Sequence, residues 1–122
     1  MIHRINTDFC ELSIFAKYAI LKVFENVFYD IEKATIVHQK FQEFFKNEPF
    51  VLITDRNFKH EVDLNLYKNK SISITNLKGL AIVSENPEER ERAINEQSLF
   101  ENSFAFFEKL TDAENWAEAF FR

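Results

Sequence analysis

Hydrophobic alternation predicts two neighbouring strands near the start of the chain. In FCELSIF, residues 9–15, Cys10, Leu12 and Ile14 share one phase and the polar residues between them share the other, which is the period of a half-buried strand. The segment YAILKVF, residues 18–24, is rich in β-forming residues and follows a short connection. We expect these two strands to pair as an antiparallel hairpin.

A helical period replaces the alternation after Asp30. Asp30 is a favourable N-cap, and Asn47 and Pro49 are expected to end the helix after Lys46. The apolar residues recur at helical spacing and form one stripe. This stripe consists of Ile31, Ala34, Val37, Phe41, Phe44 and Phe45.

Two continuous apolar runs predict central strands covered on both faces. FVLI, residues 50–53, leads into Thr54 and Asp55, and LAIV occupies residues 80–83. Such runs are typical of buried parallel strands. Gly79, the single glycine, directly precedes the second run, and we expect it to end the preceding helix in a left-handed conformation.

The segment between these two runs has a mixed pattern. Leu64, Tyr67, Ile74 and Leu77 fit a helix, whereas residues 71–75 alternate like a strand. Parallel neighbours need a crossover of roughly a dozen residues or more, usually helical. We therefore predict a helix over residues 63–77.

Capping signals predict a helix from Asn86 to about Gln97. Asn86 is the N-cap, and Pro87 and Glu89 are favourable first-turn residues. Only Ala93 and Ile94 are expected to face the core, with Glu88 and Arg92 paired on a mostly solvated surface. The segment SFAFFE, residues 103–108, then predicts a fifth strand.

A final helix is predicted behind a capping box of Thr111 and Glu114. Its apolar stripe comprises Ala113, Trp116, Ala117, Phe120 and Phe121. The element order is therefore β-β-α-β-α-β-α-β-α, an α/β single domain over residues 1–122. Its mixed sheet has an antiparallel N-terminal hairpin followed by parallel strands.

Composition narrows the function classes. The net charge of -5 comes from interspersed acids and bases, so there is no basic stripe and we expect no nucleic-acid partner. Apolar runs are far too short for a membrane span, and the N-terminus lacks the apolar core of a signal peptide. A lone cysteine, Cys10, gives no disulfide framework. We expect a cytoplasmic protein.

The motifs that carry common chemistries are missing. A single glycine excludes phosphate-binding loops and dinucleotide fingerprints, and G-x-S-x-G is absent. In KHEVD, residues 59–63, His60, Glu61 and Asp63 lack metal-ligand spacing and are interpreted as a solvated loop. His38 is interpreted as a boundary residue of its helix and Cys10 as a buried apolar residue. We expect no catalytic residue, metal or cofactor.

The candidate binding residues are Asp55, Arg56 and Asn57. They follow a buried strand, and open α/β sheets bind ligands outside the carboxyl ends of their strands. An Asp at this position also starts ordinary loops by accepting hydrogen bonds from nearby N–H groups. Both interpretations of Asp55, contact residue and structural residue, stay open.

Aromatic residues are unusually abundant, with 15 Phe in 122 residues. Phe106 and Phe107 are consecutive in a predicted strand and so face opposite sides of the sheet. One of them needs a helix, a ligand or a partner as cover. The same question applies to the rest of the C-terminal cluster, which also contains Phe104, Phe120 and Phe121.

The element order, the strand end LITD, the passage GLAIVSENPEERERA and the closing FFEKLTDAENWAEAFF together resemble STAS-like proteins. This is the domain class of anti-sigma-factor antagonists and sulphate-transporter tails. In particular, the chain resembles its small stand-alone bacterial branch, which is distantly similar to CRAL-TRIO lipid-binding domains. The resemblance covers nearly the whole chain.

The resemblance implies an open sheet with helices mainly on one face, no catalysis, and action through binding of proteins, small ligands or a second copy. In the antagonists, the loop after the central strand carries a serine that is phosphorylated. The corresponding segment here, DRNFKHEVDLN, has neither serine nor threonine, although Asp55 matches the strand-ending acid.

The sequence therefore predicts a non-enzymatic regulatory or protein-interaction module, with itself as one candidate partner in a homodimer. The alternative is a carrier or sensor for a small apolar ligand held in a Phe-rich pocket. An enzyme ranks third.

Overall fold

The computed structural model describes residues 2–57, 59–68 and 74–122. Its main sheet has six strands in the order β1-β2-β3-β5-β7-β8, and β4 and β6 form a separate two-stranded ribbon. The strands are β1 His3–Asn6, β2 Cys10–Ile14, β3 Tyr18–Val23, β4 Phe28–Tyr29, β5 Phe50–Asp55, β6 Glu61–Val62, β7 Leu77–Val83 and β8 Ser103–Phe107. The helices are α1 Ile31–Phe45, α2 Pro87–Gln97 and α3 Leu110–Ala119, with a 3-10 turn η1 at Leu64–Lys68.

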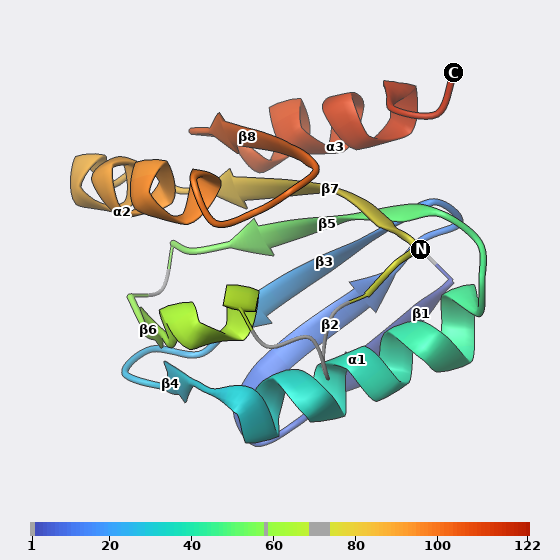
Figure 1. The fold of residues 1–122 in the computed structure, drawn as a ribbon, viewed down its shortest axis with the longest axis horizontal. Coiled ribbons are helices and arrows are strands. Elements are labelled where there is room, and N and C mark those ends of the chain that lie inside the picture. The colour runs from blue at the N-terminus through green and yellow to red at the C-terminus, as the bar shows by residue number, and fades with distance from the viewer. Residues whose placement is uncertain (1, 58, 69–73) are drawn as a thin grey trace.

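The predicted sheet is confirmed in its essentials. β2 pairs antiparallel with β3, and β3, β5, β7 and β8 run parallel to one another. β1, which the sequence analysis missed, pairs antiparallel with β2 at the edge of the sheet (Figure 1). The mixed α/β architecture with an N-terminal hairpin is therefore correct, with β1 and the β4–β6 ribbon as additions.

Alternation along β5 builds a core on each side of the sheet. Phe50 and Leu52 pack toward α1, whereas Val51 and Ile53 pack toward α3. The α1 side also receives Ala34, Val37, Phe41 and Phe45 from α1 and Ala93 from α2. Helices thus cover both faces: α1 and α2 lie on one and α3 lies on the other (Figure 1).

The first two helices begin at their predicted caps. The Asp30 side chain accepts a hydrogen bond from Lys33 N at 3.2 Å, and the Asn86 side chain accepts one from Glu88 N at 3.0 Å. The predicted capping box of the last helix is wrong. α3 begins at Leu110 with Lys109 as its N-cap, so Thr111 lies inside the helix.

The predicted helix over residues 63–77 is also wrong. Among its described residues, only Leu64–Lys68 is helical, as a 3-10 turn, and Leu77 already belongs to β7. Its middle, residues 69–73, lies outside the described residues. Serine and β-branched residues disfavour a helix in the second half, and Leu64 is 44% exposed instead of packed in the core.

Gly79 does not end a helix. It lies within β7, paired with Val51 and Ser103, and its φ angle is not positive. A Cβ at this position would lie 2.9 Å from Val51 Cγ1 and 3.0 Å from the Trp116 and Phe120 rings. The glycine therefore allows α3 to pack closely on the sheet.

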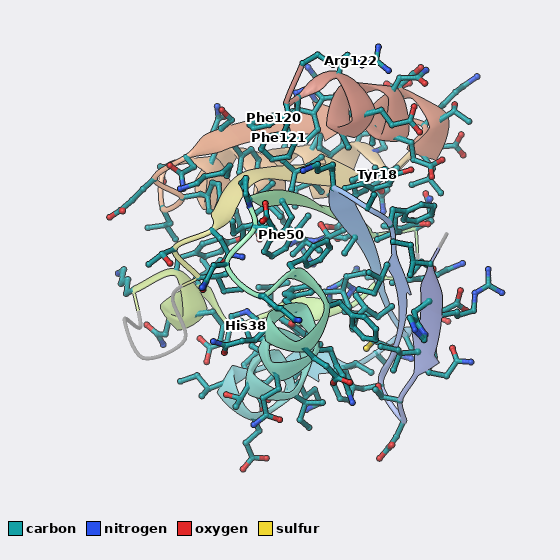
Figure 2. All side chains as sticks on the ribbon, turned by 90° about the vertical axis from the view of Figure 1, so that its right-hand side faces the viewer. Tyr18, His38, Phe50, Phe120, Phe121 and Arg122 are labelled. Carbon is teal, nitrogen blue, oxygen red and sulfur yellow. The ribbon has the colours of Figure 1, made fainter. Side chains whose placement is uncertain are left out.

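The adjacent Phe106 and Phe107 lie on opposite faces, as predicted: Phe106 packs on the α1 side and Phe107 on the α3 side. Figure 2 shows Phe50 in the interior beside α1, with Phe120 and Phe121 toward α3. In the described part of the chain, no helix is long and apolar enough to cross a membrane.

Candidate functional site

The carboxyl ends of β5 and β7 meet at one end of the sheet, where Asp55, Arg56 and Asn57 lie. The Asp55 carboxylate accepts hydrogen bonds from the Asn57 backbone N at 3.1 Å and from its side-chain amide at 2.8 Å. Asn57 Oδ1 in turn accepts from Glu85 N at 3.3 Å. Asp55, only 8% exposed, therefore shapes this loop, and Asn57 joins it to the loop after β7.

Arg56 turns inward, between the sheet and α2. Its backbone N donates to Val83 O at 2.8 Å, and its guanidinium forms a two-pronged ion pair with Glu96 of α2, with Nη2 2.6 Å from Oε1. Both side chains are almost completely buried. Tyr67 of η1 adds a hydrogen bond from its hydroxyl to Glu96 Oε1 at 2.6 Å.

This network fastens three elements together. Burial alone would raise the pKa of Glu96, but the hydrogen bonds and charge of Arg56 outweigh it and hold that pKa below its usual value. Burial, together with the Glu96 charge, raises the pKa of the Tyr67 hydroxyl. Arg56 and Glu96 therefore stay ionised and Tyr67 stays protonated at neutral pH, which suits a structural clamp between β5, α2 and η1.

The inward face of α2 differs from the one that its sequence predicts. Ile94, predicted to face the core, is 61% exposed, whereas Glu89 and Glu96 are buried. Arg92 pairs with Glu89 at 3.2 Å and with Glu61 at 3.4 Å, and not in the predicted manner with Glu88. The sequence spacing could have predicted this face, because Glu89, Ala93 and Glu96 fall at i, i+4 and i+7 on one side of the helix.

A cavity of about 140 Å³ lies between α2 and the segment that follows β5. His60, predicted to lie in a solvated loop, is buried against it at 6% exposure. Both elements contribute acidic and basic side chains to its wall, and Arg56 is one of them. The lining residues are Arg56, His60, Glu61, Val62, Leu64, Glu89, Arg92, Asn95 and Glu96.

The charged side chains at this end of the sheet are largely paired with one another, which limits the chemistry that they can carry out. Within residues 2–57, 59–68 and 74–122, no group of three or more His, Cys, Asp or Glu side chains has an arrangement that could hold a metal ion. Cys10 lies elsewhere, buried in β2 beside Thr7, where burial raises the pKa of its thiol. Of the three candidate residues, only Asn57 is exposed.

Three apolar side chains in or beside β4 and β6 are exposed. Phe28 of β4 is 52% exposed, Ile31 at the start of α1 is 39% exposed, and Leu64 of η1 is 44% exposed. Backbone hydrogen bonds from Glu61 N to Val27 O and from Asp63 N to Tyr29 O fasten β4 to β6 (Figure 1). We call Phe28, Ile31, Asn57 and Leu64 the strand-end surface.

Comparison with known proteins identifies the fold. No family model matches the chain, and no curated protein sequence is significantly similar to it. Among solved structures, the chain is similar to an uncharacterized protein of the DUF3478 family from Shewanella loihica PV-4, described as having a SpoIIAA-like fold. The TM-score is 0.62 at 17% sequence identity, and the alignment covers 88% of this chain and 91% of that one. The chain therefore has the SpoIIAA-like fold, which is the STAS-like architecture that its sequence predicts.

Proposed function

We propose that the chain is a non-enzymatic, STAS-like interaction module that binds a partner protein through the strand-end surface. The observation that carries this proposal is that Phe28, Ile31 and Leu64 are all exposed and lie in or directly beside the paired strands β4 and β6. Apolar side chains grouped beside a polar rim are typical of protein-binding surfaces. A cytoplasmic, bacterial regulatory setting, expected from the sequence, belongs to the same proposal.

The clamp beneath this surface supports a binding role. Hydrogen bonds join Arg56 and Tyr67 to Glu96. These bonds hold β5, η1 and α2 in one relative geometry. A preformed surface loses less conformational entropy when it binds. Asp55 and Arg56 then act by shaping the site, and Asn57 is the candidate residue placed to touch a partner.

The alternative function, carriage of a small apolar ligand among Phe side chains, has less support. The cavity beside Arg56 is lined mainly by charged and polar residues. Phe104 and Phe106 pack on one face of the sheet, while Phe107, Phe120 and Phe121 pack on the other. These rings therefore contribute to two separate apolar layers instead of one pocket.

Site-specific photocrosslinking in cells tests the proposal. A benzophenone side chain replaces Phe28 in one variant and Ile2 in a matched control, since Ile2 is similarly exposed at 61%. Ile2 precedes β1, which runs parallel to β3, so it lies at the opposite end of the sheet. We expect a discrete protein adduct from position 28 and none of the same mass from position 2.

Purified partner then provides the quantitative test. The Phe28→Ser and Leu64→Ser substitutions should together weaken its binding at least about tenfold, or roughly 1.4 kcal/mol, while circular dichroism confirms the fold. Equal crosslinking at both positions, or unchanged affinity of the double variant, would refute the strand-end surface as the binding site.

A further inference from the structure

The β8 edge is the second surface that needs an explanation. β8 is a five-residue strand, SFAFF, at the end of the sheet order, and it contains no charged residue or proline. Edge strands normally carry such residues because an unguarded edge pairs with other chains. Phe104 through Phe107 are only partly buried, so the helices leave this edge incompletely covered.

The direction of the backbone groups fixes how the edge can pair. Phe107 O accepts a hydrogen bond from Ser84 N, so the backbone of Phe107 faces β7. Backbone direction alternates along a strand, so Ala105 also faces β7, while Phe104 and Phe106 direct their N–H and C=O groups outward. Within the described residues, no backbone hydrogen bond from a loop or turn reaches those outward groups.

We propose that β8 pairs antiparallel with β8 of a second copy of this chain, about a two-fold axis at Ala105. In this register, Phe104 of each copy lies opposite Phe106 of the other. The two residues exchange both backbone hydrogen bonds, and symmetry repeats the pair. Every outward group of Phe104 and Phe106 is then satisfied, and the two sheets become continuous.

Side chains complement each other in the same register. Each opposed Phe104–Phe106 pair places two aromatic rings on the α1 and α2 face, a favourable cross-strand combination. Arg90 of α2 already lies over the Phe106 ring, 5.7 Å from its centroid. In the bends that flank the strand, Glu101 of one copy lies toward Lys109 of the other, twice by symmetry, so opposite charges approach each other at both ends.

The interface is short, because only β8 and its flanking residues contribute. Interfaces below about 1,200 Å² are typically weak and transient. We therefore expect a monomer at low micromolar concentration and a dimer that accumulates at roughly 100 micromolar. This surface is distinct from the strand-end surface, so each can fail without the other.

A charge-swap experiment at the axis tests the pairing. Ala105→Lys and Ala105→Glu each place like charges opposite each other, and each variant alone should sediment as a monomer at every concentration. Their equimolar mixture should restore the dimer, because Lys then faces Glu. The same pair of substitutions at Asn6, exposed on the opposite edge in β1, should leave self-association unchanged.

Two results would overturn the proposal: a wild-type chain that stays monomeric up to several hundred micromolar, or a dimer that persists in both separate Ala105 variants. If the charged variants fail to fold, as judged by circular dichroism, the wild-type concentration series still decides. Because the photocrosslinking partner binds elsewhere, these variants should bind it with unchanged affinity.

Discussion

The two edge strands of the main sheet, β1 and β8, are protected in different ways. β1 is polar and largely exposed, and its Arg4 pairs with Glu11 of β2 at 3.4 Å. β8 is apolar, and α2 and α3 pack against its two faces. Charged residues such as Arg4 disfavour pairing of β1 with another strand, whereas at β8 the helices cover the faces but leave the backbone edge open. The difference indicates that only β8 is suited to pair with another chain.

The largest predicted effect comes from breaking the clamp that joins α2 to β5 and η1. Glu96→Gln removes the charge that compensates buried Arg56, and loss of one partner of a buried ion pair typically costs about 3–5 kcal/mol. Urea denaturation should show this loss. Glu61→Gln is the control, since its side chain is 65% exposed and its loss should cost less than about 1 kcal/mol. Equal destabilisation by the two substitutions would show that the clamp does not anchor α2.

Gly79→Ala tests the packing of α3 on the other face of the sheet. The added methyl group would lie 2.9 Å from Val51 Cγ1, so α3 or the neighbouring strand must shift. Overpacking of this kind costs roughly 1–3 kcal/mol. Lys78→Ala, at the exposed preceding residue, is the control and should be nearly neutral. A Gly79→Ala variant as stable as the wild type would contradict close packing of α3 on β7.

Acid titration provides a smaller and more specific test of the clamp. The pKa of Glu96 is lowered in the folded protein, mainly by Arg56 against the opposing effect of burial. Its contribution to stability is therefore fully present above the unfolded-state pKa of about 4.3 and is lost as the pH falls through the lower folded-state pKa. The difference in stability between wild type and Glu96→Gln should narrow as the pH falls through that range. A difference that is constant from pH 7 to pH 2 would assign the cost to packing instead of charge.

The smallest effect is expected at β1. A double-mutant cycle on Arg4 and Glu11, whose side chains are 55% and 36% exposed, should give a coupling energy below about 1 kcal/mol. Thermal or urea unfolding of the four variants measures it. A coupling of several kcal/mol would mean that the polar edge depends on this pair for its stability, and the contrast with β8 would weaken.

Strong hydrophobic patterns predicted most of the fold. Segments with weak patterns were missed or wrongly predicted. The apolar strands β5 and β7 and the capped helix α2 were predicted because their signals are local. β1 was missed because HRIN contains one apolar residue and is held by pairing with β2. The segment before β7 was wrongly predicted to be a helix. The rule that parallel strands are usually joined by a helix conflicts here with residues of poor helix propensity.

The candidate site was predicted in position but not in its interactions. Asp55, Arg56 and Asn57 do lie at the carboxyl end of the central strand. Their individual roles depend on residues remote in sequence: Glu96 lies 40 residues from Arg56, and Glu85 lies 28 residues from Asn57. No local pattern encodes such pairs, although two acids on the apolar side of α2 indicate that a buried cation must lie nearby.

Disulfide formation across the β8 edge tests the central claim most directly. In the proposed register, the two Ala105 residues form a non-hydrogen-bonded pair with Cα atoms about 4.5 Å apart, within the range of roughly 4.4–6.8 Å that a disulfide spans. An Ala105→Cys variant in a Cys10→Ala background should form a covalent dimer on mild oxidation at about 100 micromolar. An Asn6→Cys variant in the same background should stay largely monomeric. Comparable crosslinking at both edges, or none at residue 105 while the variant remains folded, would contradict the pairing of β8 with a second copy.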